Sequence, residues 1–495
     1  MEESHVEVDN VCDIARYLDE YTFFNLKYTC KLMGKELGKG YIQNASIRTN
    51  KIVYTVIKKR KNVFITGPAG CGKTYTVQKI IEEGKKYDLN IEVTSTTGIS
   101  ACHFDGGKTL HSFARLRLAK MKVSDIQDNY DNNNKIYGGK KHWINTDILV
   151  IDEVSMLGSR FFEKINLCAQ LARNDSRVFG GLQVVLCGDF LQLPPVMDSY
   201  VFTSPEFLKL KMITYRMEEN VRQNGDMRFF HLLNRVRMGE LTEKDIEILH
   251  SKVRGSHTMI PDLLGFISPV LYPTNKMVND TNEKHFLSIA GELEDSISSL
   301  DMLLKRVYDP AIKKHVYTHY MGNMTMNAAL NKLGKAYKSK YPALLEFKND
   351  TQYFLTCNIS VEGKMVNGSL CLYKDGYLVF RDGKTLEIKK DMHEFRQNKT
   401  IGYITRILPI EGDIFLSRKQ IPLKLGYAVT IHSSQGMTLD EARIDIGKSV
   451  FTASQSYVAL SRLRNLDGVS LSEFDPRKIR APKKALEYYK KLFRE

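Results

Sequence analysis

The sequence contains a phosphate-binding pattern, GPAGCGKT, which spans Gly67 to Thr74. It follows the apolar run NVFIT and precedes a segment with helical periodicity, which is the context that a phosphate-binding loop needs. Glycines at this spacing let backbone N–H groups turn toward phosphate, and the dipole of the following helix favours negative charge. The pattern predicts that Lys73 binds the β- and γ-phosphates of a nucleoside triphosphate and that Thr74 binds magnesium. The other loop positions expected to contact phosphate are Gly67, Pro68, Ala69, Gly70, Cys71 and Gly72.

A second candidate group lies at the end of the run DILVIDE, where strand-forming residues stop at Asp152 and Glu153. The carboxyl ends of parallel strands meet at one edge of a sheet, and ligands bind there. We expect Asp152 to hold magnesium and Glu153 to act as the general base for an attacking water. Alone, an Asp-Glu pair is usually a plain strand end; the phosphate-binding loop favours the catalytic interpretation.

A third strand-like run, VVLC, leads into GDFLQLPPV. A neutral amide at the same sheet edge can hydrogen-bond both phosphate and water, so we expect Gln192 to sense the γ-phosphate and Asp189 to support the water shell of magnesium. Pro194 and Pro195 would stop the strand and turn the loop toward the nucleotide. Without the other two motifs, Gln192 would be read as an ordinary polar loop residue.

The composition is that of a globular protein with an excess of positive charge. Hydrophobic residues make up 43% of the 495 residues and charged residues 26%. No apolar run approaches the roughly 18 residues needed to cross a bilayer, and the length predicts two to four domains. The net charge of +15 favours nucleic acid over a membrane as partner, with a merely basic enzyme as the alternative.

The eight cysteines form no CxxC pair and no cluster with zinc spacing, which predicts reduced thiols inside a cell. The first residues, MEESHVEVDN, are acidic where a signal or transit peptide would be basic, so neither secretion nor import into an organelle is expected. The expected location is the nucleus, the cytoplasm or a viral replication site.

Beyond these motifs, the chain divides into stretches of different pattern. From Asn62 onward, β-branched runs alternate with amphipathic segments, which indicates βαβ units on a parallel sheet. A polar, Asn-rich stretch from Leu116 to Lys141 interrupts them and is either a wedge or a plain loop. The run from Glu294 to Asp350 is expected to be mostly helical, and short strands with turn signals from Tyr353 to Leu423 predict a small antiparallel barrel.

After this barrel the α/β pattern resumes with PLKLGYAVTIHSSQG, so the barrel is predicted to be inserted into a second α/β domain. The C-terminal segment PRKIRAPKKALEYYKKLFRE predicts a docking helix with a solvated basic face. Its apolar residues at helical spacing are Ala485, Tyr488, Leu492 and Phe493.

In these motifs and their order, the sequence resembles the superfamily 1 helicases of the RecD-like branch, and within them the PIF-type (petite integration frequency) DNA helicases. The resemblance runs from about Asn62 to Leu471 and is weaker between Glu294 and Asp350. Besides the three motifs, it rests on TSTTGISACHFDGGKTLHSF, FFEKINLCAQLAR, ENVRQ, LYPTNKMVNDTN, NGS, YAVTIHSSQGMTLD and YVALSRLRNLDG.

The resemblance implies an α/β fold with two RecA-like P-loop domains, which bind ATP and Mg²⁺ between them. Arg222 and Arg462 would reach the γ-phosphate from the second domain, and Gly436 would add a further contact. The implied parts are an N-terminal helical extension (1–45), a first RecA-like domain (46–212) with a wedge insertion (115–141), a second RecA-like domain (213–352 and 422–475), an inserted SH3-like barrel (353–421) and a basic C-terminal helix (476–495).

The implied activity is ATP-dependent translocation from 5′ to 3′ on single-stranded DNA, with unwinding of forked or 5′-tailed duplexes. The protein would act as a monomer, alone or with replication or recombination proteins. Small hydroxyls and amides suit sequence-independent phosphate contacts, whereas aromatic rings could stack on bases or simply pack. The positions that match the DNA channel are Thr97, Gly98, His111, Phe113, Thr430, His432, Ser434 and Gln435.

Three positions depart from the family's pattern. Thr49 stands where a glutamine usually reads adenine, Ser433 where lysine is common, and Asp350 where glycine is usual. Two other functions fit the same motifs: a RecD-like motor subunit of a nuclease or recombination complex, and an ATP-gated clamp that does not unwind. The presence of both arginines and the general base favours a motor over a clamp.

Overall fold

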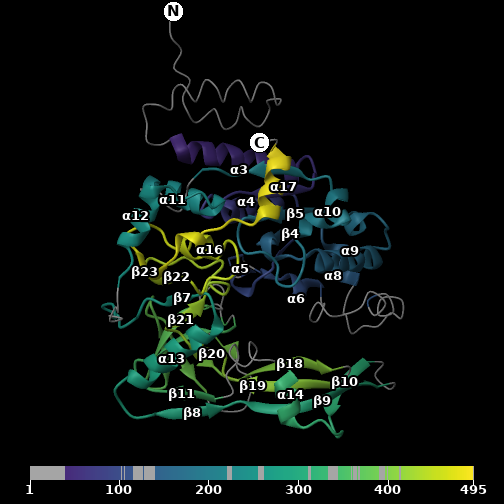
Figure 1. Cartoon of the computed structure of the whole chain (residues 1–495). Coiled ribbons are helices and arrows are strands. Elements are labelled where there is room, and N and C mark those ends of the chain that lie inside the picture. Colours follow the sequence, from purple (N-terminus) through teal and green to yellow (C-terminus); the bar gives the residue numbers. More distant parts are fainter. Residues whose placement is uncertain are drawn as a thin grey trace, which may run out of the picture.

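The computed structural model is shown in Figure 1. It describes residues 40–101, 103–104, 106–114, 126, 140–219, 226–254, 261–309, 314–332, 344–357, 359, 365, 368–389, 396–397, 400–411 and 414–493. Most of the predicted N-terminal extension, nearly all of the predicted wedge and Arg222 therefore lie outside the described residues.

Six parallel strands form the first sheet, in the order β3-β2-β4-β5-β1-β6. They are β1 (Val63–Thr66), β2 (Ile91–Ser95), β3 (Lys108–Thr109), β4 (Ile148–Asp152), β5 (Gln183–Cys187) and β6 (Ile213–Arg216). The accompanying helices are α3 (Gly40–Ile57), α4 (Lys73–Lys85), α5 (Gly98–Ala101), α6 (Leu110–Ala114), α8 (Lys140–Asn145), α9 (Ser159–Arg173) and α10 (Pro205–Lys209), with 3₁₀ turns η3 (Val154–Met156), η4 (Val178–Gly181) and η5 (Val201–Thr203). Strands β1 and β4 are buried along their whole length because helices cover both faces of the sheet, which confirms the predicted βαβ pattern.

Four parallel strands form the second sheet, in the order β21-β7-β22-β23. They are β7 (Val270–Tyr272), β21 (Ala428–Thr430), β22 (Ala442–Ile446) and β23 (Val469–Phe474). Their helices are α11 (Met227–Met238), α12 (Glu243–Ser251), α13 (Asn275–Ser288) and α16 (Gln455–Leu460). We call the parts built on these two parallel sheets the first unit and the second unit.

The chain between β7 and β21 forms mainly antiparallel sheets, which occupy the lower part of Figure 1. Seven strands form the sheet β16-β17-β15-β14-β13-β12-β20, four form β10-β9-β19-β18, and two form β11-β8. The strands are β8 (Asp295–Ser298), β9 (Leu300–Asp309), β10 (Lys314–His319), β11 (Leu344–Phe347), β12 (Gln352–Leu355), β13 (Leu370–Lys374), β14 (Tyr377–Phe380), β15 (Thr385–Ile388), β16 (Arg396–Gln397), β17 (Thr400–Ile401), β18 (Ile404–Glu411), β19 (Ile414–Gln420) and β20 (Leu423–Leu425).

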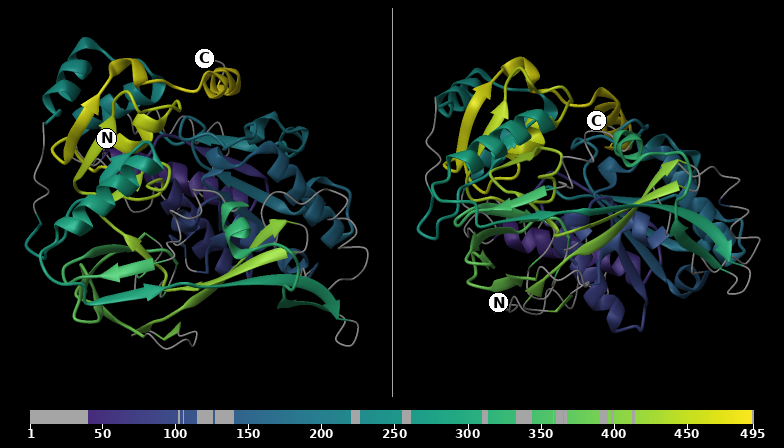
Figure 2. Two further views of the ribbon diagram at one scale, coloured as in Figure 1. Left: turned by 60° about the horizontal axis from the view of Figure 1, so that its bottom comes forward. Right: turned by 90° about the horizontal axis from the view of Figure 1, so that it is seen from below.

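The prediction that Glu294 to Asp350 is mostly helical is wrong. The described part of this run holds four strands, β8 to β11, and the short helix α14 (Met326–Lys332). Strand β9 pairs with β19, more than a hundred residues later in the chain, and the two form a long ribbon in Figure 2. The local sequence pattern of β9 does not reveal so distant a partner, yet the pairing with that partner decides that this segment is a strand.

The C-terminal helix α17 (Lys483–Phe493) follows the turn η6 (Pro476–Lys478) and packs against the first unit (Figure 1). Ala485 is fully buried there, and Tyr488, Leu492 and Phe493 are partly buried against the same core, so the predicted docking face is confirmed. Among the described residues, no helix is both long and apolar enough to cross a membrane.

Candidate nucleotide site

The loop Gly67 to Thr74 connects β1 to α4. At several of its positions the backbone has a conformation that favours glycine. Gly67 has φ of 147°, and a β-carbon there would lie 2.2 Å from the carbonyl oxygen of Met217. Gly70 and Gly72 have φ of 80° and 82°, in the left-handed region that glycine adopts without steric cost. The glycines that the sequence marks as a phosphate cradle thus form a tight turn directly before a helix N-terminus.

Lys73 is the first residue of α4, and its ammonium group donates hydrogen bonds to the carbonyl oxygens of Gly67 at 2.9 Å and Pro68 at 2.8 Å. Burial alone would lower the pKa of Lys73, but Cys71 and Asp189 act in the opposite direction and hold it above its usual range. The side chain therefore carries a positive charge inside the cradle. Thr74 follows it in the first turn of the helix.

Asp152 and Glu153 lie at the end of β4, as predicted. Asp152 is 5% exposed, and burial together with the negative charge of Glu153 raises its pKa. Glu153 has φ of 54°, a left-handed conformation that is uncommon outside glycine, and its N–H donates to Asp152 Oδ1 at 2.9 Å. The turn thereby separates the two carboxylates, one into the sheet edge and one toward the second unit.

Gln435 of the second unit contacts Glu153 directly. Its side-chain amide donates to Glu153 Oε2 at 3.0 Å and to the hydroxyl of Ser155 at 3.4 Å. The residue is 1% exposed, so its side chain is not available to DNA and the predicted DNA contact is replaced by one to the candidate general base.

Asp189 is fully buried and forms a two-pronged ion pair with Arg237, which lies on α11 of the second unit. Arg237 Nε and Nη2 each lie 2.8 Å from one carboxylate oxygen. Burial would lower the pKa of Arg237, but the charge of Asp189 raises it above its usual range, so the guanidinium stays charged. The prediction that Asp189 supports a magnesium water shell is therefore corrected: both of its oxygens bind this arginine.

Gln192 lies in the loop that follows Asp189, and its backbone N–H donates to the Asp189 carbonyl oxygen at 2.9 Å. The side chain is 3% exposed, and its amide oxygen has no hydrogen-bond partner among the described residues. A buried polar atom without a partner is costly unless a ligand or water completes it. An amide oxygen accepts hydrogen bonds, so this atom suits a water molecule beside the phosphate, whereas the Gly67 cradle and the charged Lys73 supply the donors that fit a triphosphate.

Magnesium is normally held by one or two protein oxygens together with substrate phosphates. Asp152 and Thr74 are the groups that would hold it here, and a divalent cation would favour the charged form of Asp152. Within the described parts of the chain, no group of three or more His, Cys, Asp or Glu side chains gathers to form a separate metal site.

Arg462, one of the two predicted arginine fingers, is 3% exposed. Its guanidinium donates to the carbonyl oxygen of Val458 at 2.9 Å and of Met437 at 3.4 Å, and to the hydroxyl of Ser461 at 2.9 Å. Met437 directly follows Gly436, which has φ of 89°. The arginine and the glycine predicted to meet the γ-phosphate are thus neighbours, although the direct contact with phosphate stays a prediction.

Two further residues that sequence reasoning missed join the units at this site. The hydroxyl of Tyr457, on α16, accepts a hydrogen bond from the N–H of Ala69 at 2.8 Å. The hydroxyl of Tyr489, on α17, lies 3.4 Å from Asp189 Oδ1. A fully buried aspartate in the Gly-Asp motif signals that some cation must neutralise it, but local sequence does not identify Arg237 as that cation.

Two predicted DNA contacts are core residues instead. Phe113 is 2% exposed and packs edge-on against Trp143, with ring centroids 4.6 Å apart, and against His142. Ser434 is fully buried and its hydroxyl donates to the Ile431 carbonyl oxygen at 2.9 Å. Neither side chain can reach a strand in this arrangement, so the packing alternative holds for Phe113.

Of the other predicted DNA positions, Thr430 is also buried, whereas Thr97 and His432 are partly exposed. His111 is exposed, and its ring stacks on Phe161 with centroids 4.1 Å apart. His432 lies parallel to the exposed ring of Phe451, at 6.0 Å. The hydroxyl of Thr97 donates a hydrogen bond to that of Ser100, and the hydroxyl of Thr430 donates one to that of Ser433, so each threonine lies at the start of a local turn. Gly98 is the first residue of α5.

The departures from the family pattern have structural explanations at two positions. The hydroxyl of Thr49 lies 3.0 Å from that of Thr76, so it joins α3 to α4 and is buried. Asp350 has φ of 64°, the conformation that glycine would supply, and its side chain pairs with Lys374 at 3.4 Å. Asp350 thus adopts the glycine-like turn at the cost of some strain.

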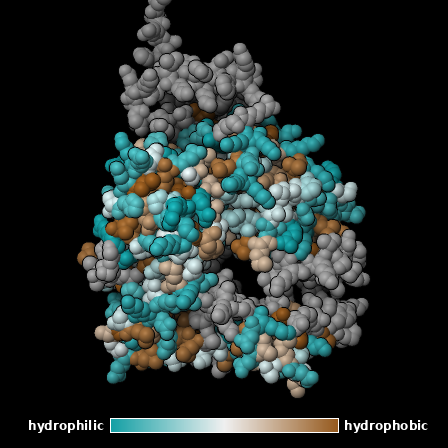
Figure 3. Space-filling view, in the orientation of Figure 1, coloured by the Kyte–Doolittle hydropathy of each residue, from teal (hydrophilic) through white to brown (hydrophobic). Residues whose placement is uncertain are grey.

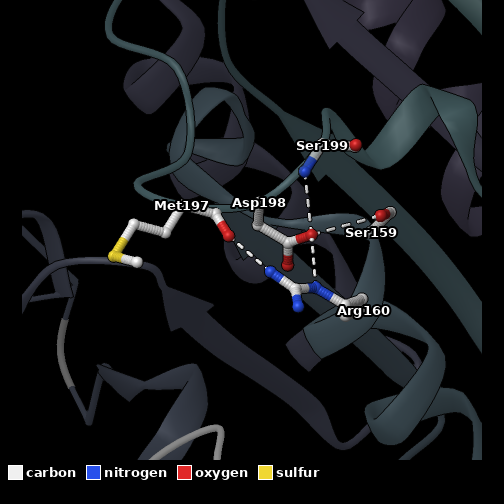
Figure 4. Close-up of a pocket in the computed structure, with 5 residues that line it drawn as sticks. All are labelled: Ser159, Arg160, Met197, Asp198 and Ser199. Atoms are coloured by element: carbon white, nitrogen blue, oxygen red, sulfur yellow. Dashed lines mark hydrogen bonds and ion pairs between the residues drawn. The ribbon is translucent and has the colours of Figure 1, made fainter.

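A pocket of about 420 Å³ lies beyond the Pro194-Pro195 stop, between Ser159, Arg160, Met197, Asp198 and Ser199 (Figure 4). Asp198 Oδ1 binds Arg160 Nε at 3.1 Å and the Ser199 N–H at 2.8 Å, and Arg160 also donates to the Met197 carbonyl oxygen. The carboxylate is therefore used to fix the loop to the start of α9.

Comparison with known proteins shows that the chain is similar to helicases. Residues 43–247 match the model of the PIF1-like helicase family. The chain is 32% identical over 457 residues to the ATP-dependent DNA helicase PIF1 of Xenopus laevis, an alignment that covers 90% of this chain and 64% of that protein. It is 30% identical over 454 residues to the human protein of the same name, covering 89% of this chain and 63% of that protein. The chain thus spans less than two thirds of the length of these relatives.

Two solved structures that resemble this chain are also helicases. The crystal structure of Pif1 helicase from Candida albicans matches with a TM-score of 0.72 and 27% identity, and the match covers 90% of this chain and 98% of that one. A Bacteroides Pif1 helicase crystallised with ADP-AlF3 and single-stranded DNA matches with a TM-score of 0.66 at 21% identity, covering 90% and 96% of the two chains, and shows the same fold.

Proposed function

From the membership of this chain in the PIF1-like helicase family, we propose that it is an ATP-dependent DNA helicase that moves from 5′ to 3′ along single-stranded DNA and unwinds duplex DNA. One observation carries the proposal. The second unit touches the candidate general base of the first unit directly, through Gln435 and Glu153. A relative movement of the two units would change the position of the base, and hydrolysis and movement would then be linked.

In the proposed reaction, Lys73 binds the β- and γ-phosphates, Thr74 and Asp152 hold magnesium, and Glu153 removes a proton from the attacking water. Magnesium would neutralise phosphate charge as it develops. Gln192 orients the water and phosphate through its buried amide. Arg222 and Arg462 would contact the γ-phosphate, and Arg462 would exchange a carbonyl partner such as Met437 for the phosphate.

The proposed DNA path runs between the units and the antiparallel sheets, where the face in Figure 3 is hollowed. Thr97, Gly98, Thr430 and His432 would contact the strand, with the exposed ring of His111 available for stacking. A related Pif1 helicase has been crystallised with single-stranded DNA, and a second solved structure concerns the unwinding of forked double-stranded DNA by Pif1 helicases, which supports these substrates.

We further propose that the helicase consists of a first RecA-like domain with a wedge at 115–141, a second RecA-like domain, an SH3-like barrel inserted into the second domain and a basic C-terminal helix (476–495). Two of the predicted bounds are corrected. β6 (Ile213–Arg216) pairs with β1, so the first domain extends beyond residue 212, and β9 (Leu300–Asp309) pairs with β19 (Ile414–Gln420), so the inserted part begins before residue 353. It would act inside the cell as a monomer, in replication, repair or recombination.

The decisive experiment measures strand displacement on duplexes with a 5′ or a 3′ single-stranded tail, with ATP and magnesium. The proposal expects unwinding from the 5′ tail and none by the Lys73→Ala variant. Unwinding from the 3′ tail alone would overturn the polarity, and ATP hydrolysis that is indifferent to single-stranded DNA would overturn the motor.

A further inference from the structure

The C-terminal segment is attached to both units. Leaving β23, it stays on the second unit, where the Arg480 carbonyl oxygen accepts from the Ser454 N–H at 2.9 Å and Lys478 donates to the Val450 carbonyl oxygen at 2.9 Å. A few residues later α17 enters the core of the first unit through Ala485 and Tyr489. The segment is therefore a strap between the units.

Helix α17 is held on the first unit by aromatic packing. The ring of Tyr488 stacks on Phe202 with centroids 4.3 Å apart and meets Phe190 edge-on at 5.5 Å. Tyr489 stacks on Phe493 within the helix, and Arg216 lies over the Phe493 ring at 5.1 Å. This contact area fixes the helix, so the position of the Tyr489 hydroxyl is well defined.

The Tyr489 hydroxyl joins two strand ends of the nucleotide site. It lies 2.5 Å from the hydroxyl of Thr66, the last residue of β1 before Gly67. It accepts from the Phe190 N–H at 3.0 Å and lies 3.4 Å from the carboxylate of Asp189, in the loop that leads to Gln192. Burial raises the pKa of Tyr489 well above its ordinary value, so the hydroxyl keeps its proton. One side chain thus links the phosphate cradle to the γ-phosphate sensor loop.

The second unit reaches the same hydroxyl through Arg237. Its guanidinium pairs with Asp189 and lies 5.7 Å from the centre of the Tyr489 ring. Thr66, Tyr489, Asp189 and Arg237 therefore form a continuous polar cluster that crosses from one unit to the other. A buried tyrosine hydroxyl usually finds a hydrogen-bond partner, and here all three partners lie at the two strand ends of the nucleotide site.

We propose that Tyr489 is a positioning residue for ATP hydrolysis, which fixes the phosphate cradle relative to the Gln192 loop and relays the approach of the second unit to both. The inference rests on the proposed function, because it concerns the rate of the same reaction. It assigns the C-terminal helix a part in the coupling of the motor, in addition to its part in the core.

The test compares Tyr489→Phe with the matched variant Tyr488→Phe. The neighbouring tyrosine contributes packing, and no hydrogen bond joins its hydroxyl to the described part of the chain. Steady-state ATP hydrolysis is measured with saturating single-stranded DNA, together with the thermal midpoint of each variant. Tyr489→Phe should lower kcat about five- to tenfold, the net effect of losing the hydroxyl and its contacts, and change KM for ATP less than twofold. Tyr488→Phe should keep the kcat of the unaltered protein.

A kcat of Tyr489→Phe equal to that of Tyr488→Phe would overturn the inference, whatever the thermal midpoints. If Tyr489→Phe does not fold, Thr66→Val removes the other end of the shortest contact and must also lower kcat. Where both fold, the double variant should lose little more than Tyr489→Phe alone, since the Thr66 contact is already absent in that variant. Absence of DNA-stimulated hydrolysis in the unaltered protein would instead count against the proposed function.

Discussion

The side-chain amide of Gln435 donates a hydrogen bond to a carboxylate oxygen of Glu153, 3.0 Å away and 282 positions earlier in the chain. Gln435 belongs to the second unit and Glu153 to the first, so the orientation of the candidate base depends on the contact between the units. In a motor that opens and closes around a nucleotide, such a contact restricts efficient hydrolysis to the closed arrangement.

Replacing Gln435 with alanine should therefore slow hydrolysis without abolishing nucleotide binding. A hydrogen bond to a charged group contributes about 1.5–3 kcal/mol, which corresponds to a loss of kcat of about tenfold or more. The loss of kcat is measured as ATP turnover with saturating single-stranded DNA, and nucleotide binding is measured separately with a fluorescent ATP analogue. Ser449→Ala, on an outer loop of the same unit, is the control; equal rates for the two variants would show that the contact has no catalytic effect.

The buried pair of Arg237 and Asp189 makes a prediction about stability. Arg237→Met leaves a buried carboxylate without its partner, which should cost about 3–5 kcal/mol in the free energy of unfolding. Arg228→Met, at an exposed position of the same helix, should cost little. Adding Asp189→Leu to Arg237→Met should restore much of the lost stability in urea denaturation, because the unpaired charge is removed. No recovery would mean that the ion pair is not the source of the loss.

Gly67 should tolerate no side chain. In Gly67→Ala the new methyl group would lie 2.2 Å from the Met217 carbonyl oxygen, so the phosphate cradle must shift. We expect ATP hydrolysis to fall more than tenfold. Gly376→Ala is the matched change at a positive φ with open space around it, and should cost about 1 kcal/mol of stability with unchanged hydrolysis. Full activity of Gly67→Ala would contradict the described loop.

His111 and Phe113 are two residues apart but should behave differently. Phe113→Ala removes a buried ring from the Trp143 cluster and should cost about 3–5 kcal/mol of stability. His111→Ala should leave stability nearly unchanged and weaken binding of single-stranded DNA about tenfold, the size of one lost base-stacking contact. Thermal unfolding and fluorescence anisotropy separate the two effects. A stable Phe113→Ala protein with weak DNA binding would reverse our correction of the predicted channel.

The lowered pKa of Asp245 predicts how the stability of the fold changes with pH. Its hydrogen bonds with Arg235, with further ones from Thr242, lower its pKa to about 2, below the roughly 3.9 of an unfolded aspartate. The pair therefore stabilises the fold above about pH 4, and the contribution, at most about 2 kcal/mol, is lost as the pH falls toward 2. Urea denaturation at pH 6 and pH 3 should show a larger loss for the unaltered protein than for Asp245→Asn. Parallel losses would exclude this carboxylate as the cause.

Sequence alone predicts the half of the site that is built from strand ends. The cradle, Asp152, Glu153 and Gln192 each follow a β-branched run directly, and parallel strands bring such ends together. The groups that reach the site from elsewhere are not predictable in this way. Arg237 and Tyr489 are 48 and 300 positions from Asp189, and nothing in their local sequence marks them. The same limit explains the error at β9, whose partner strand lies far along the chain.

The strap also has a consequence for the order in which the protein can be built. Ala485 and Tyr489 belong to the core that surrounds Phe190 and the first sheet, yet they are translated after the whole second unit. At about 5–20 residues per second, a ribosome needs on the order of tens of seconds to make the intervening chain. During this time the first unit lacks the apolar side chains of α17, and its phosphate cradle lacks the hydroxyl that joins Thr66 to Asp189. The nascent protein therefore acquires a finished nucleotide site only after the whole second unit and α17 have been synthesised.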